Sequence, residues 1–187
     1  MAAPDRLQTL PEIEAAIWRE LGRAAGDKLH EWRVPVLATA DAGVPDARTV
    51  ILREVDIEAR CLVIYSDARA KKIQQLQVQS QAVLVMWSRR LSWQLRLRAE
   101  VLVHTEGLAA TSRWASLQAS AAAIDYLSPQ APGEPLDPAA GRGGAAQQRG
   151  HFAVLMARVQ AVDWLELQGN GHRRAAFDSQ GARWLVP

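Results

Sequence analysis

The chain has 187 residues, of which 49% are hydrophobic and 22% charged, a balance typical of a globular protein and not of a disordered one. Its net charge of +2 is too small to indicate a nucleic-acid partner unless the positive charges cluster. No signal peptide and no apolar run of the roughly 20 residues that a bilayer span needs is apparent, so we expect a cytoplasmic protein without a membrane partner.

Cysteine and histidine usage gives no sign of a disulfide or metal site. Cys61 is the one cysteine, and we expect it to be a small core residue in the run CLVIY. The four histidines are scattered without metal-ligand spacing, so we predict no metal.

The first predicted element is an amphipathic helix within residues 1–28. Thr9 and Glu12 form a capping box, and Gly26 can end the helix. Its apolar face carries Leu10, Ile13, Ile17 and Leu21.

Short β-branched runs separated by turn residues come next, and they predict antiparallel strands near residues 34–40, 47–55 and 61–66. The segment AKKIQQLQVQSQ predicts a short helix, and AVLVMW a buried strand. The inward side chains expected on that helix are Ile73, Leu76 and Val78.

The segment SWQLRLRAEVLVH alternates between apolar and polar residues, which predicts a strand whose polar face meets solvent, a polar cavity or a subunit interface. A third helix is expected over residues 105–127, with Leu117, Ala121 and Ile124 on one face. Residues 128–150 are rich in Pro, Gly and Ala and predict a long flexible loop, followed by three closing strands. Strands joined by hairpins favour an antiparallel barrel or sandwich in a single domain over residues 1–187.

The start of the second helix is unusual because Lys71 and Lys72 stand where the helix dipole favours acidic residues. Arg48 at a strand start and Ser66 at a strand end add a cation and a hydroxyl from separate elements. Such groups bind phosphate by charge-assisted hydrogen bonds, together with backbone N–H groups at a helix start. The pattern therefore indicates an anion at this helix.

The segments RTVILR, YSDARAKK and WQLRL resemble, in order and spacing, motifs of the pyridoxamine 5′-phosphate oxidase-like FMN-binding proteins. The resemblance covers about residues 30–187. It implies a mainly β fold with flanking helices, an antiparallel split β-barrel of the FMN-binding type. It also implies a homodimer with FMN at the subunit interface.

The resemblance implies roles for particular residues. Arg48, Lys71 and Lys72 would hold the FMN phosphate, whereas Gln130 would reach the FMN of the second subunit. The full implied cofactor set is Arg48, Thr49, Val50, Ile51, Arg53, Tyr65, Ser66, Lys71, Lys72, Gln94, Gln130 and Trp164. The implied substrate-binding residues are Arg53 and Arg173. Ala70 departs from the pattern, which usually has Ser there.

The implied function is an FMN-dependent oxidoreductase that transfers a hydride to or from a small molecule. The chain is not expected to be an efficient pyridoxamine 5′-phosphate oxidase, because the three phosphate-binding positions on the third helix fall at about Arg113, Leu117 and Ala121. A true oxidase and a non-enzymatic flavin-binding protein remain alternatives. The remaining alternative, a nucleic-acid binder, would use Arg89, Arg90, Arg96 and Arg98.

Overall fold

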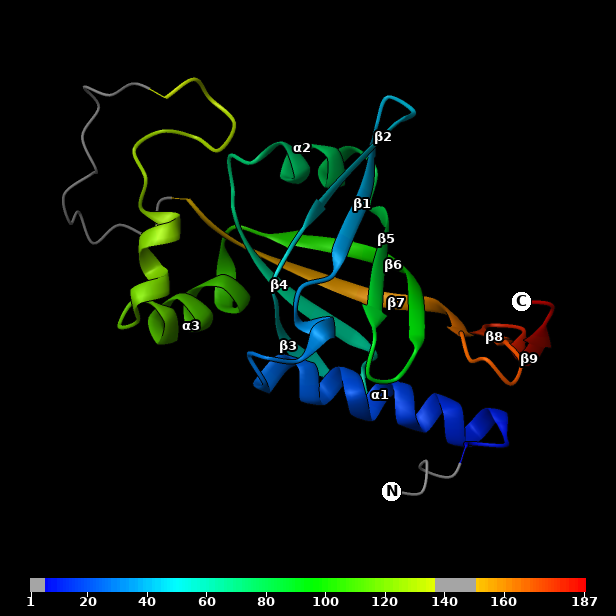
Figure 1. Cartoon of the computed structure of the whole chain (residues 1–187). Coiled ribbons are helices and arrows are strands. Elements are labelled where there is room, and N and C mark those ends of the chain that lie inside the picture. The colour runs from blue at the N-terminus through cyan, green and yellow to red at the C-terminus, as the bar shows by residue number, and fades with distance from the viewer. Residues whose placement is uncertain (1–5, 137–150) are drawn as a thin grey trace.

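The computed structural model describes residues 6–136 and 151–187, so the predicted loop is described only over residues 128–136. Figure 1 shows a strongly curved antiparallel sheet with helices around it. The helical segments are α1 (Leu10–Gly26), η1 (Glu31–Arg33), α2 (Lys71–Val78), α3 (Gly107–Leu117) and η2 (Ala121–Tyr126). The strands are β1 (Val36–Asp41), β2 (Val44–Thr49), β3 (Leu52–Asp56), β4 (Cys61–Asp67), β5 (Gln81–Ser88), β6 (Trp93–His104), β7 (Phe152–Glu166), β8 (Arg173–Asp178) and β9 (Gly181–Leu185).

The order of the main sheet is β2-β1-β5-β6-β7-β4-β3, and β8 and β9 extend it from β7. Every recorded strand pair is antiparallel. The two end strands of this order, β2 and β3, are consecutive in the chain, so the sheet must curve until its ends approach each other. This arrangement is a split barrel, and it confirms the predicted fold class.

The single strand predicted over residues 47–55 is wrong, because the chain changes partner within it. β2 pairs with β1, whereas β3 pairs with β4. Between them Val50 is buried and donates its N–H to the Pro35 carbonyl, whereas Ile51 is 41% exposed. A continuous apolar run therefore hides a corner at which the chain crosses the opening of the barrel.

Figure 1 shows α1 across one end of the barrel and α2 at the opposite end. The predicted capping box of α1 is confirmed, since Glu12 N–H donates to Thr9 Oγ1 and the Glu12 carboxylate accepts from Thr9 N–H. The apolar face of α1 buries Ile13, Ile17 and Leu21 completely. The helix therefore closes its end of the core. Within the described residues, no helix combines the length and apolar character that a membrane crossing requires.

Two details of the predicted helices are wrong. Val78, expected to face inward, is 89% exposed because α2 ends there. The third helix also ends early, at Leu117, and a 3₁₀ turn follows. Its three-residue period turns Ala123 and Tyr126 inward and leaves Ile124 73% exposed.

The buried apolar residues form two clusters. The larger fills the barrel and includes Trp32, Trp93 and Trp164. The smaller packs α3 and η2 against the outer face of β4 and β7, around Trp114 and Phe152. Side chains on successive residues of β4 therefore enter different environments, one inside the barrel and one beneath α3.

Candidate functional site

The start of α2 holds a part-buried cation, Lys72. Lys72 Nζ lies 3.4 Å from the hydroxyl of Ser66, which is 5% exposed. Within the described residues, no carboxylate forms an ion pair with Lys72. Burial, and then the nearby Arg48 cation, lower the pKa of Lys72, although Asp67 and Asp46 partly oppose them. A bound anion would raise the pKa of Lys72 again, since it would stabilise the charged lysine.

The backbone at the start of α2 is also open to an acceptor. Ala70 is the N-cap residue and provides no side-chain hydrogen bond to the first turn. The first N–H groups of a helix need acceptors from outside the helix, and phosphate oxygens are suitable ones. Ser66, Lys72 and this helix start therefore offer three kinds of anion contact.

Arg48 lies on β2 but is held by a polar network that the sequence did not reveal. Its guanidinium donates to Thr39 Oγ1 at 2.7 Å and to Gln75 Oε1 at 3.1 Å, and pairs with Asp46 at 2.6 Å. Thr39 and Gln75 are 6% and 5% exposed, and Thr39 donates to Gln75 at 2.6 Å. The contact of Arg48 with phosphate stays a prediction, and it requires part of this network to open.

Lys71 differs from Lys72 in its exposure and in its ion pairing. Its side chain is 65% exposed and pairs with Asp41 at 3.1 Å, beside the β1–β2 turn. Two adjacent lysines on a helix point about 100° apart, so one faces the protein and the other solvent. The sequence pattern alone gave them equal weight.

Arg69 fixes the segment after η2 beside α2. It pairs with Asp67 at 2.7 Å and donates to the carbonyls of Ser128, Pro129 and Gln130 at 2.9, 3.1 and 3.2 Å. The side-chain amide of Gln130 donates to the Pro135 carbonyl. Gln130 thus lies close to the α2 start of its own chain, and its contact with a second subunit stays a prediction.

The structure separates Tyr65 from Ser66, because neighbouring residues of β4 face opposite ways. Ser66 lies beside Lys72, whereas Tyr65 points beneath α3 and donates its hydroxyl to Glu54 at 2.6 Å. Burial, and then Glu54, raise the pKa of Tyr65. Arg53 lies over the Tyr65 ring, with its guanidinium carbon 5.6 Å from the ring centroid.

The resemblance implies that the backbone of residues 49–51 runs along the flavin, and these residues lie at the barrel opening. Thr49 and Ile51 are exposed on either side of buried Val50. Gln94 on β6 is half-buried and pairs across the sheet with Trp87, which is 45% exposed. These residues face outward from the sheet and are accessible to a ligand or a second subunit.

Trp164 and Arg173 have packing roles in the structure. None of Trp164 is exposed, and its ring lies 5.4 Å from that of Trp93. Arg173 pairs with buried Glu166 at 2.8 Å, donates to the Leu7 carbonyl at 2.6 Å and stacks on Trp164. A fully buried indole and an engaged guanidinium offer no surface to a ligand in this conformation, so their predicted ligand contacts gain no support.

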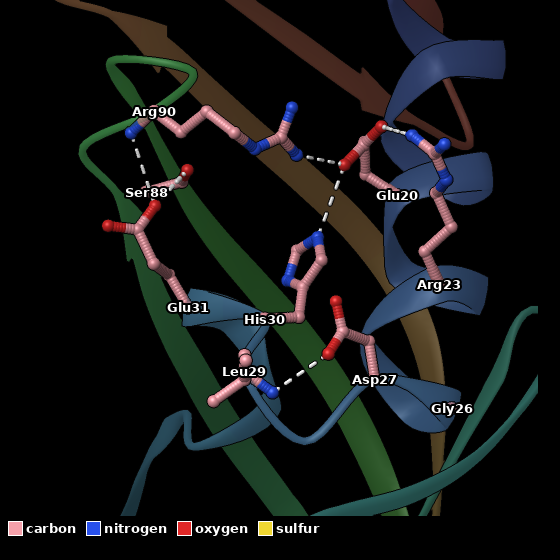
Figure 2. A pocket seen from close by; sticks show the side chains of 9 residues that line it. All are labelled: Glu20, Arg23, Gly26, Asp27, Leu29, His30, Glu31, Ser88 and Arg90. Atoms are coloured by element: carbon pink, nitrogen blue, oxygen red, sulfur yellow. Dashed lines mark hydrogen bonds and ion pairs between the residues drawn. The ribbon is translucent and has the colours of Figure 1, made fainter.

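A prominent cavity lies away from the predicted cofactor residues. Figure 2 shows its side chains, contributed by α1, η1 and the β5–β6 turn, in a space of about 690 Å³. Glu20 is buried and accepts from Arg23, His30 and Arg90 at 2.9, 3.1 and 2.6 Å (Figure 2). Burial raises the pKa of Glu20, but these three partners outweigh it and the pKa lies below its usual value. The polar groups satisfy one another, which indicates a structural junction.

The fold is that of the FMN-binding split barrels. Residues 15–105 match the family described as pyridoxamine 5′-phosphate oxidase, FMN-binding domain. Over these residues, which include β1 to β6 and α2, the chain belongs to the pyridoxamine 5′-phosphate oxidase-like FMN-binding domain family. No curated protein matches the sequence.

Solved structures match the fold over the whole chain. A pyridoxamine 5′-phosphate oxidase-related, FMN-binding protein from Nostoc punctiforme matches with a TM-score of 0.75 and 22% identity, over 100% of both chains. PhzG from Burkholderia lata, solved with tetrahydrophenazine-1-carboxylic acid, matches with a TM-score of 0.73 and 17% identity, over 100% of this chain and 98% of PhzG. A heme-binding protein from Mycobacterium smegmatis matches with a TM-score of 0.54 and 20% identity, over 87% of this chain and 58% of that one. At these identities the matches establish the fold.

Proposed function

We propose that this protein is an FMN-dependent oxidoreductase that acts on a small molecule. The observation that carries the proposal is Lys72, a part-buried cation beside the Ser66 hydroxyl and an uncapped helix start, with no carboxylate partner among the described residues. The matched family is an FMN-binding domain, and FMN carries a phosphate that suits these groups.

The residues present fit the phosphate end of FMN. Lys72 and the N–H groups at the start of α2 would hold its oxygens, and Ser66 would add a hydroxyl bond. Arg48 lies close enough to lower the pKa of Lys72 and would add a second positive charge. FMN, when bound, supplies hydride transfer through its isoalloxazine ring. The protein's part is to bind and orient the cofactor and substrate.

We propose that the cofactor lies at the interface of a homodimer. The outer face near the barrel opening exposes apolar side chains in a group around Thr49, which supports a second copy as the covering partner. The exposed fractions are 53% for Val34, 37% for Val36, 41% for Ile51 and 45% for Trp87. A substrate between the subunits would approach the flavin from this opening.

The absorbance spectrum of the purified protein tests the cofactor, and light scattering tests the dimer. We expect flavin absorbance near one FMN per chain after reconstitution, and a mass of two chains. Reduction of that flavin by NADH, NADPH or an amine then supports an enzyme. A flavin-bound protein that none of these donors reduces would favour a non-enzymatic flavin carrier, and a protein that binds no FMN would refute the proposal.

A further inference from the structure

A charged cluster beneath α3 lies outside the predicted phosphate site. The pairing of β3 with β4 shifts register between Leu52 and Glu54, so Arg53 is the extra residue of a bulge. A bulge turns two successive side chains toward the same side of a strand. Both Arg53 and Glu54 contact Tyr65, one over its ring and one at its hydroxyl.

Glu54 neutralises the second arginine of this cluster. Arg113 on α3 donates through Nε and Nη2 to both carboxylate oxygens of Glu54, at 2.9, 3.1 and 2.7 Å. The carboxylate also accepts from Tyr65. Burial raises the pKa of Glu54, but Arg113 and Tyr65 outweigh it, so the pKa lies below its usual value and the group stays charged at neutral pH.

Arg53 is the other arginine of this cluster. No carboxylate of the described residues forms an ion pair with it, and its Nε is buried without a hydrogen-bond partner. It hydrogen-bonds Tyr126, whose hydroxyl is neutral because burial raises its pKa, so this contact does not balance the charge of Arg53. Two arginines and one glutamate therefore leave the cluster with one unbalanced positive charge.

The cluster is open to solutes. The side chains of Glu54 and Arg113 are 41% and 23% exposed, so a ligand can reach their ion pair without unfolding the helix. The charge that this surface presents to a ligand depends on Glu54. While Glu54 is paired with Arg113, a ligand meets the Arg53 cation and the Glu54 carboxylate.

We propose that Glu54 is a specificity-determining residue that restricts the substrate to a single negative charge, such as a carboxylate, and rejects phosphate monoesters. This inference rests on the proposed function for the identity of the reaction. The charges of the cluster do not depend on that function. A carboxylate matches the planar fork of Arg53. A phosphate dianion needs a second cation, and here it meets the Glu54 carboxylate, which acts as a repulsive element.

The test titrates the FMN-reconstituted protein with benzoate and phenyl phosphate by calorimetry. Glu54→Gln keeps the shape of the side chain and an acceptor for Tyr65 but removes the negative charge that neutralises Arg113. We expect phenyl phosphate affinity to rise about tenfold or more, as gaining a charged hydrogen bond implies. Benzoate affinity should change by less than about threefold, because a singly charged ligand needs only Arg53.

The double variant Glu54→Gln with Arg113→Gln is the matched control and should lose most of the gain, because Arg113 can no longer bind the second charge of the phosphate. A folded Glu54→Gln variant without the gain, or a gain that persists in full without Arg113, overturns the proposal. Should Glu54→Gln fail to fold, Glu54→Ala takes its place, since it also removes the carboxylate. The same rise in phenyl phosphate affinity is expected, and no rise overturns the proposal. Flavin absorbance of the same samples tests the proposed function separately. If reconstitution leaves no bound FMN, the proposed function fails, while the titration still reports the charge preference of the cluster.

Discussion

The clusters around Glu20 and Lys72 contain similar groups but balance them differently. Glu20 is a buried anion with three donors, each within hydrogen-bond distance. Lys72 is a part-buried cation whose hydrogen-bond partner among the described residues is the Ser66 hydroxyl, at 3.4 Å. The Glu20 cluster borders a large cavity. The phosphate contact proposed for the Lys72 cluster does not depend on such a cavity. Under the proposed function, the unbalanced charge at Lys72 marks the ligand site and the cavity at Glu20 does not.

The largest expected effect is on the balanced cluster. Glu20→Ala removes a carboxylate that joins α1, η1 and the β5–β6 turn, and it leaves His30 without its acceptor. Since Arg23 and Arg90 are more than half exposed and can be hydrated, we expect a loss of about 2–3 kcal/mol in the free energy of unfolding. Urea denaturation measures it.

FMN affinity of the refolded Glu20→Ala protein should equal that of the wild type. A large loss of FMN affinity with little change in the free energy of unfolding would contradict the structural role of Glu20. It would then favour the cavity of Figure 2 as the ligand site.

Lys72→Ala should lower FMN affinity without lowering stability, the opposite of what we expect for Glu20→Ala. We expect FMN affinity to fall by about one to two decades, because one charged hydrogen bond contributes about 1.5–3 kcal/mol. The free energy of unfolding of the FMN-free protein should not decrease, since burial already disfavours this charge. Fluorescence titration of FMN measures the affinity.

Lys71→Ala is the matched control for Lys72→Ala. Its ammonium pairs with Asp41 and is mostly exposed, so FMN affinity should change by less than about threefold. Equal losses in both variants would contradict the distinction that the structure makes between the two lysines.

The pH dependence of FMN binding sharpens the comparison further. Lys72 has a lowered pKa, so its charge is lost as pH rises through that pKa, before an ordinary lysine would titrate near 10.5. FMN affinity should fall in that range by up to about tenfold. Lys72→Arg keeps its charge there and should abolish the fall; an unchanged profile would exclude Lys72 as the titrating group.

Ala70→Ser should change stability by less than Glu20→Ala does, and in the opposite direction. Ala70 has extended backbone, φ −64° and ψ 141°, which suits a capping serine. The new hydroxyl should accept from the first turn of α2 and stabilise the FMN-free protein by about 1 kcal/mol. Thermal unfolding measures this, and a lower melting temperature would show that the hydroxyl finds no donor.

The sequence predicts most of the fold because its periodicities are strong. The capping box of α1, the alternation of β6 and the hairpin signals of β7 to β9 are local, and each is confirmed. The corner at Val50 could not be predicted, because the chain there changes partner without any change in residue type. The register shift at Arg53 is hidden for the same reason: it depends on β4, a different part of the chain.

The candidate site is less predictable than the fold. Sequence motifs locate Ser66 and Lys72, but they cannot tell which of two adjacent lysines faces the protein. The partners of Arg48 come from β1 and α2, and the partner of Arg113 comes from β3. Such contacts between distant segments follow from packing, so the sequence alone missed Thr39, Gln75 and Glu54.

The position of β7 has a consequence for how the chain folds. This strand, Phe152–Glu166, pairs with β4, β6 and β8, so it joins the two halves of the barrel. β4 cannot enter the sheet until a segment about 90 residues further on has reached it, and closing such long loops slows folding. During synthesis on the ribosome, β3 and β4 must therefore wait with open edges until β7 emerges. The N-terminal part of the chain is thus the part that a chaperone would have to shield.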